Sequence, residues 1–312
     1  MAALLLSPHN QIKYMRIRLI FVLAFLWVTN VLFAQTYAFK VLVSKGKTEY
    51  KSANDTWQMI KVGSSLKPTD EVKVGENAYL GLIHSSGKAL EVRDAKTYKV
   101  SDLVTKMPPG TSVINKYTDF ILSSATEKKN RLSATGAVHR AIVPTDNILI
   151  FLPKDDQAKV YGDRVVVQWA PAKVKGTYLV VFTNMMGEEL AKIETAETFT
   201  VVSLTDEKFK KENQVLVKVT GKGKYFVTSG DDLIIKKFKP AERQKIDSLV
   251  NAADFPKDES ALTKYIKAGF YEENMLLIDA LTAYHDAAKL APDVELYTTA
   301  YQDFLVRLGF IK

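Results

Sequence analysis

Few side chains in this sequence have the type and spacing that catalysis needs. Cysteine is absent, which excludes disulfides, thiolate metal sites and cysteine nucleophiles together. The histidines at 9, 84, 139 and 285 form no pair with metal-ligand spacing, and no serine lies in a G-x-S-x-G elbow. We therefore expect no catalytic residue, no metal and no cofactor.

Acidic pairs and glycine loops are the remaining sequence signals for chemistry. Adjacent acidic residues include those at 155–156, 188–189, 231–232, 258–259 and 272–273. Neighbours on a strand point to opposite faces, so one such pair cannot supply both carboxylates of a glycosidase. The segment GLIHSSGKA at 81–89 lacks phosphate-loop spacing, and Ala89 replaces the required hydroxyl residue. The sequence predicts that this protein is not an enzyme.

The first 34 residues have the pattern of a secretory leader. A basic stub ending at Arg18 contains no acidic residue and precedes an unbroken apolar run over residues 19–28. Ten helical residues rise about 15 Å, half of a hydrocarbon core of about 30 Å. We predict a signal peptide over 1–34, with Met15 as the true start and cleavage between Ala34 and Gln35. The mature chain would then be periplasmic or secreted, with no transmembrane span; a retained N-terminal anchor is the alternative.

Charge is distributed unevenly along the remaining chain. Residues 35–239 carry 32 basic and 23 acidic side chains, net +9, whereas residues 240–312 carry 8 and 12, net −4. The simpler interpretation is a solvated, lysine-rich surface with an acidic tail. The alternative is a basic face that meets anionic envelope polymers or lipid head groups. Because no nucleic-acid-binding motif is present, we expect no nucleic-acid partner.

Residues 35–103 have the pattern of a small β-domain, with short apolar alternations separated by turns about every ten residues. Ala78, Leu80 and Leu82 are predicted to share one face of a strand. A strand ending in glycine, a lone Trp and the run G..L...D.V.VG.NA.L.L..SSG..LEV resemble the FecR-type extracellular β-domain. The matching positions are Gly46, Trp57, Gly63, Leu66, Asp70, Val72, Gly75, Ala78, Leu80, Leu82, Gly87 and Leu90.

That resemblance implies a domain type and a compartment more than a role. Founding members of the family sense iron-siderophore uptake and signal to a sigma factor through a cytoplasmic segment and a membrane span. At most eighteen residues precede the apolar run here, so we expect that signalling apparatus to be missing.

A second β-domain is predicted over residues 142–239, after a connector at 104–141 that combines a helix near 112–122 with a basic linker. Val165, Val167 and Trp169 alternate on one strand, and Tyr178 follows nine residues later on the next. About seven strands with a buried Trp resemble a fibronectin-type or immunoglobulin-like sandwich. We expect Trp169 to be a core residue and not a ligand platform.

From residue 240 the apolar period changes from 2 to 3.6, which predicts helices near 240–255, 258–268, 272–290 and 294–308. Ala280, Tyr284, Ala287 and Pro292 resemble the second half of a tetratricopeptide repeat. Because one such unit does not stand alone, we expect the helices to dock against the sandwich or a partner. His285 is predicted to be solvated.

The predicted fold class is multi-domain and mainly β, with two β-domains followed by an α-helical segment at 240–312. The predicted function is an exported, non-catalytic envelope protein that binds or scaffolds through its β-domains and its tetratricopeptide-like hairpin. Its partner would be another envelope protein or an envelope polymer. Two alternatives remain open: a membrane-anchored signal transducer of FecR type, and a glycan- or peptidoglycan-binding module that uses the basic β half.

Overall fold

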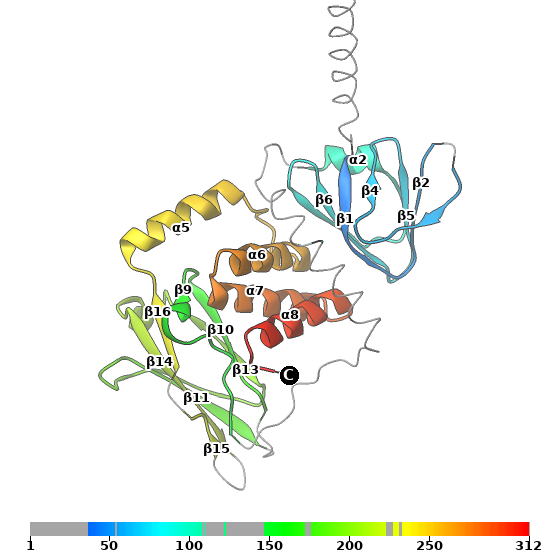
Figure 1. Ribbon diagram of the computed structural model, residues 1–312. Helices are drawn as coiled ribbons and strands as arrows, with labels where there is room; N and C mark the ends of the chain where they lie inside the picture. The colour runs from blue at the N-terminus through cyan, green and yellow to red at the C-terminus, as the bar shows by residue number, and fades with distance from the viewer. Residues whose placement is uncertain are drawn as a thin grey trace, which may run out of the picture. The chain divides into compact units, whose positions relative to one another are not determined.

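The computed structural model describes residues 37–53, 55–107, 109, 122, 147–171, 176–222, 227–230 and 233–311 (Figure 1). The predicted signal peptide, with Ala34 and Gln35, lies outside these residues, as do nearly all of the predicted helix and linker at 104–141. From Ala38 to Lys312 the chain forms one compact unit. Within the described residues, no helix has the length and apolar character needed to cross a membrane.

Two four-stranded antiparallel sheets form the N-terminal β-unit. One has the order β4-β1-β6-β7 and contains β1 (Phe39–Lys45), β4 (Ser65–Leu66), β6 (Tyr79–His84) and β7 (Ala89–Val92). The other has the order β3-β2-β5-β8 and contains β2 (Thr48–Lys51), β3 (Gln58–Met59), β5 (Glu71–Val74) and β8 (Thr97–Lys99). A short helix that the alternation did not predict, α2 (Val100–Thr105), closes one end of the core with Val100 and Leu103.

The turns of this unit depend on glycine and on one buried carboxylate. Gly46, with φ +72°, lies in the left-handed region that favours glycine. A Cβ at Gly75 would lie 3.0 Å from the carbonyl oxygen of Lys47, so a side chain there would press the two turns apart. The buried Asp70 carboxylate accepts hydrogen bonds from the Ser52 hydroxyl at 2.9 Å and the Lys67 N–H at 2.8 Å.

The second β-unit has the strand pairing of an immunoglobulin-like sandwich. Its strands are β9 (Lys159–Val160), β10 (Arg164–Gln168), β11 (Thr177–Thr183), β12 (Glu189–Thr195), β13 (Phe199–Ser203), β14 (Gln214–Lys222), β15 (Val227–Thr228) and β16 (Leu233–Lys237). One sheet has the order β12-β11-β14-β16-β9, with β15 on β14, and the other pairs β10 with β13. An antiparallel bridge from Ile150 to Trp169 adds the first segment beside β10. β10 and β13 thus lie in one sheet, and β11, β14 and β16 lie in the other. This division of the strands is that of an immunoglobulin-like sandwich.

The core of the sandwich is centred on Trp169, as predicted. Its side chain is fully buried, and its ring meets that of Tyr178 edge-on with centroids 5.3 Å apart. Val165 and Val167 are also fully buried in the same cluster. The alternation in the sequence therefore identified the inward face of this strand correctly.

Four helices complete the chain: α5 (Pro240–Ala253), α6 (Ala261–Glu273), α7 (Leu277–Leu290) and α8 (Glu295–Arg307). Pro240 occupies the first turn of α5, and the Ser260 hydroxyl accepts the N–H of Thr263 to cap α6. The α6–α7 turn falls at Asn274–Met275, where Met275 has φ +59°. The sequence placed it several residues too early. The mainly β chain followed by a helical segment is confirmed.

Nearly every side of α7 is buried, so the prediction that His285 is solvated was wrong. That side chain is 4% exposed and lies 4.7 Å from the Phe199 ring and 5.9 Å from the Tyr301 ring, measured between centroids. α7 packs against α6 and α8 and also against β10, so the side opposite its apolar stripe is covered as well (Figure 1). Ala280 and Ala287 are fully buried.

The helices also bury the second face of strand β6. Leu80 and Leu82 face the core between the two N-terminal sheets, as predicted. Tyr79 and Ile83, on the other face, belong instead to the cluster formed by α6, α7 and α8. Since both faces of β6 are buried, the single apolar face predicted at 78–82 is only half of the arrangement.

Candidate functional site

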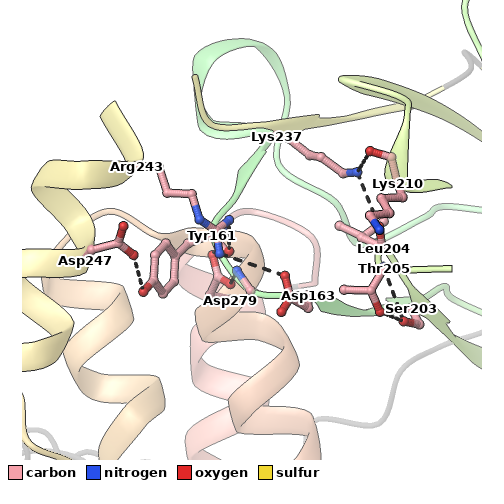
Figure 2. Close-up of polar contacts among 11 residues, drawn as sticks. Tyr161, Asp163, Ser203, Leu204, Thr205, Lys210, Lys237, Arg243, Asp247 and Asp279 are labelled. Atoms are coloured by element: carbon pink, nitrogen blue, oxygen red, sulfur yellow. Dashed lines mark hydrogen bonds and ion pairs between the residues drawn. The ribbon is translucent and has the colours of Figure 1, made fainter. Parts of the chain in front are cut away.

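The helices are fastened to the sandwich by a buried carboxylate in the first turn of α7. Asp279 accepts the backbone N–H of Tyr161 at 2.9 Å and that of Gly162 at 2.7 Å (Figure 2). The side chain is 5% exposed. Burial raises the pKa of Asp279 to about 6, although both backbone N–H groups and the Arg243 charge act in the opposite direction. A Cβ at Gly162 would lie 2.9 Å from the carboxylate, so any other residue there would have to displace the Asp279 side chain.

α5 holds the same turn from another side. Arg243 donates to the Tyr161 carbonyl at 2.8 Å, and its guanidinium lies 4.9 Å from the centroid of the Tyr161 ring. The Tyr161 hydroxyl donates to Asp247 at 2.9 Å, as Figure 2 shows. Burial and this hydrogen bond raise the pKa of Tyr161 to about 12. The tyrosine therefore stays protonated at physiological pH and acts as a structural donor.

Lys237, at the end of β16, serves a neighbouring loop. Its ammonium donates to the carbonyls of Phe209 at 2.7 Å and Leu204 at 3.3 Å, next to the short helix α4 (Glu207–Lys210). Burial lowers the pKa of Lys237. Because it is surrounded by carbonyl oxygens, this lysine closes a loop and is not presented to a substrate.

The polar cluster of Figure 2 is consequently a structural junction. Every donor and acceptor discussed above is matched inside the protein. Over the described ranges, no three His, Cys, Asp or Glu side chains come together as they would to hold a metal ion. Sequence reasoning missed Asp279, because it lies inside the predicted helix at 272–290 and the turn it binds is more than a hundred residues away in the sequence.

A second junction connects the helices to the N-terminal unit. The hydroxyls of Tyr79 and Tyr297 are hydrogen-bonded at 2.6 Å inside the apolar cluster, and burial raises the pKa of both. The Glu91 carboxylate accepts the N–H of Leu262 at 2.7 Å, in the first turn of α6. Ion pairs Lys88–Asp254 and Lys45–Asp293 lie around this contact.

Three of the four positions of the predicted tetratricopeptide-like unit are buried. Ala280, Tyr284 and Ala287 lie in the apolar cluster, whereas Pro292 is exposed in the turn between α7 and α8. The Tyr284 hydroxyl donates to Glu272 at 2.7 Å. These three side chains therefore face the interior of the protein.

The outer face of the sheet β3-β2-β5-β8 remains open among the described residues. Strand register places seven side chains on it: Met59, Glu49, Lys51, Glu71, Lys73, Thr97 and Lys99. Trp57, just before β3, joins them because its ring lies near the ammonium groups of Lys51 and Lys73. The alternate residues Val72, Val74 and Tyr98 point into the core instead. We refer to this surface as the Trp57 face.

Trp57 lies at one edge of this face and is half-buried. The ammonium groups of Lys51 and Lys73 lie 5.1 and 5.8 Å from the centroid of its ring. Lys51 also pairs with Glu71 at 3.0 Å. Lys73 and Lys99 are exposed, and neither has an ion-pair partner within the described part of the chain. The face thus combines a large aromatic side chain with two lysines that form no ion pair with any described residue.

Comparison with known proteins adds little to this geometry. No model of a known protein family matches the chain, and no curated protein matches it. Solved structures that match include the chicken CNTN1 FN1–FN3 domains, at 10% identity over 66% of this chain and 55% of that chain, with a TM-score of 0.22. A two-domain fibronectin type-III segment of chicken tenascin matches at 11% identity over 65% and 86%, with a TM-score of 0.20.

At these TM-scores the likeness carries no argument, and the immunoglobulin-like topology depends on the strand pairing itself. The comparisons support neither the FecR-type nor the tetratricopeptide resemblance.

Proposed function

We propose that this protein is an exported, non-catalytic binding scaffold whose Trp57 face binds an anionic envelope polymer, namely peptidoglycan. The observation that carries the proposal is the Trp57 face itself, an open sheet surface with one large aromatic ring and two lysines, Lys73 and Lys99, that form no ion pair among the described residues. The helices support the scaffold role, because one apolar cluster includes residues of both β-units and of α6–α8.

The chemistry of the Trp57 face suits a sugar polymer that carries carboxylates. The apolar side of a pyranose ring can pack on the indole of Trp57, which supplies a large contact area at low entropic cost. Lys73 and Lys99 lie on adjacent strands of the same face and can pair with carboxylates of the polymer. Glu49 and Glu71 on the same face disfavour a uniformly anionic chain such as a nucleic acid.

Several finer assignments belong to the same proposal. The N-terminal unit would be a FecR-type β-domain over 35–103, and residues 240–312 a tetratricopeptide-like segment that acts as an internal cap. Cleavage between Ala34 and Gln35 would release the chain into the periplasm or the medium. Intact-mass measurement on fractionated cells tests the export step; a membrane-bound species that keeps Met15 would favour an anchored transducer instead.

Binding is tested by co-sedimentation of the purified chain with insoluble peptidoglycan. We expect retention that falls steeply with salt, because the attraction between exposed charges is screened. Trp57→Ala should weaken retention about tenfold, and the double substitution Lys73→Glu with Lys99→Glu should abolish most of it. Lys192→Glu, on exposed β12 of the other β-unit, is the matched control and should bind normally. Equal losses in the control and the Trp57-face variants would overturn the proposal.

A further inference from the structure

A cavity of about 430 Å³ lies where the ends of three helices meet the sandwich. It is lined by the end of α6, the start of α7, the end of α8 and Gln157 from a single 3₁₀ turn at Asp155–Gln157. No residue of the Trp57 face or of the Figure 2 cluster lines it. An inference about this cavity is therefore independent of the proposed function.

The floor of the cavity is apolar. Leu277, Phe304 and Leu308 line it, and all three belong to or pack against the cluster shared by the helices. Met275 lies in the α6–α7 turn at the cavity wall and is 60% exposed. Its unbranched thioether chain can adapt to a bound apolar group. The cavity can therefore accept an aliphatic chain at little cost in rearrangement.

Charge around the cavity is negative once the internal pairs are counted. Arg307 donates to both carboxylate oxygens of Glu272, at 2.7 and 2.8 Å, so its charge is matched by that carboxylate. Glu272 also accepts the Tyr284 hydroxyl. Glu273, the next residue, is exposed, and its carboxylate contacts no cation among the described residues. The cavity therefore offers a ligand an apolar floor with the carboxylate of Glu273 beside it.

From this arrangement we infer that the cavity binds the alkylammonium side chain of a lysine presented by a partner polypeptide. The four-carbon stem packs on Leu277, Phe304 and Leu308, and the ammonium pairs with Glu273. An anionic ligand is disfavoured, because the arginine at the site already holds Glu272 in a bidentate pair. The excess negative charge of residues 240–312 attracts the same kind of partner.

The inference is tested with n-hexylammonium as the probe and the full chain labelled with ¹³C at the methionine methyl groups. Met275→Leu assigns the Met275 signal. We expect this signal to shift saturably with hexylammonium, and much less with hexanol or hexanoate at equal concentration. Glu273→Gln should weaken binding about three- to fivefold, as for an exposed ion pair, and Glu273→Lys should abolish it. Glu189→Gln, an exposed carboxylate on β12, should have no effect.

Three outcomes would overturn the inference. The first is no shift of the Met275 signal at any hexylammonium concentration. The second is equal binding of hexanol, which would mean that the cavity recognises only apolar surface. The third is a loss of hexylammonium affinity in Glu189→Gln as large as in Glu273→Gln, which would assign the effect to net charge. Because Glu273 is exposed, its substitution leaves the core intact and the test does not depend on a fragile variant.

Discussion

The two junctions of the helical segment are built differently. At the sandwich, side chains of α7 bind strand and turn backbone directly: Asp279 accepts two N–H groups, and the Thr282 hydroxyl accepts the N–H of Val166 at 3.1 Å. At the N-terminal unit, the contact is mostly apolar, with the Tyr79–Tyr297 hydrogen bond inside it and ion pairs around it. One junction is directional and local, and the other is distributed over a surface.

This difference predicts different tolerance to change. A backbone N–H cannot be removed by substitution, so losing its side-chain acceptor leaves it buried and unpaired. An apolar contact with peripheral ion pairs instead loses stability in small steps. The sandwich junction should therefore be sensitive to single substitutions, and the N-terminal junction should be sensitive to salt.

The largest effect is expected at Asp279. At pH 4, Asp279→Ala leaves the N–H groups of Tyr161 and Gly162 without acceptors, which should lower the free energy of unfolding by about 3 kcal/mol. Urea denaturation followed by tryptophan fluorescence measures this change, since Trp169 reports on the sandwich. Glu189→Ala is the control and should change stability by less than about 0.5 kcal/mol. A loss at Asp279 no greater than in the control would contradict the directional junction.

The pH dependence of stability should locate the same carboxylate. Its pKa is about 6 when folded and 3.8 in the unfolded reference, so the folded state binds the proton more tightly. The Asp279 contribution to stability is then greatest below pH 3.8 and is lost as pH rises through 6. Between pH 4 and 7 we expect the free-energy difference between wild type and Asp279→Ala to shrink by roughly 2–3 kcal/mol. A difference that does not change with pH would show that the carboxylate titrates elsewhere.

A smaller effect is expected at the buried tyrosine pair. Tyr79→Phe or Tyr297→Phe alone should cost about 1–2 kcal/mol, because each removes the buried hydrogen bond between the two hydroxyls. The double variant removes both polar groups and should cost less than the sum of the single variants. A double-mutant cycle by urea denaturation measures the coupling. Additive losses would mean that the two hydroxyls do not depend on each other.

The smallest effect should come from the exposed ion pairs of the N-terminal junction. Lys45→Ala removes the pair with Asp293, which lies 2.6 Å away with both side chains partly exposed. We expect a loss of about 0.5 kcal/mol at low salt that disappears near 1 M salt. Thermal unfolding at two salt concentrations measures it. A loss that persists at high salt would assign Lys45 a packing role instead.

Some features of this protein follow from local sequence alone. The change of apolar period at residue 240 predicted the helices, and the alternation of Val165, Val167 and Trp169 predicted a buried strand face. Both patterns reflect contacts inside one element or one sheet, where spacing along the chain fixes which side chains point the same way. Helix ends were less accurate, because the α6–α7 turn depends on Met275 in a left-handed conformation that its residue type does not favour.

The candidate sites needed the tertiary structure. Trp57 was selected by its position in a resemblance, but only the folded sheet brings Lys51 and Lys73 to its ring on one open face. Glu273 was noted as one of an adjacent acidic pair; the cavity beside it requires three helix ends and a turn of the sandwich.

Periodicity determined which faces of this chain are apolar, whereas tertiary packing decided which of the remaining faces are also buried. His285 and Tyr79 both lie on faces that their neighbours in sequence leave open, and each is covered by an element distant in the chain. The buried carboxylate of Asp279 also depends on a distant element. It accepts hydrogen bonds only because folding places the turn at 161–162, more than a hundred residues away in the sequence, beside it. Local sequence specifies what a side chain can do, and long-range packing specifies what it meets.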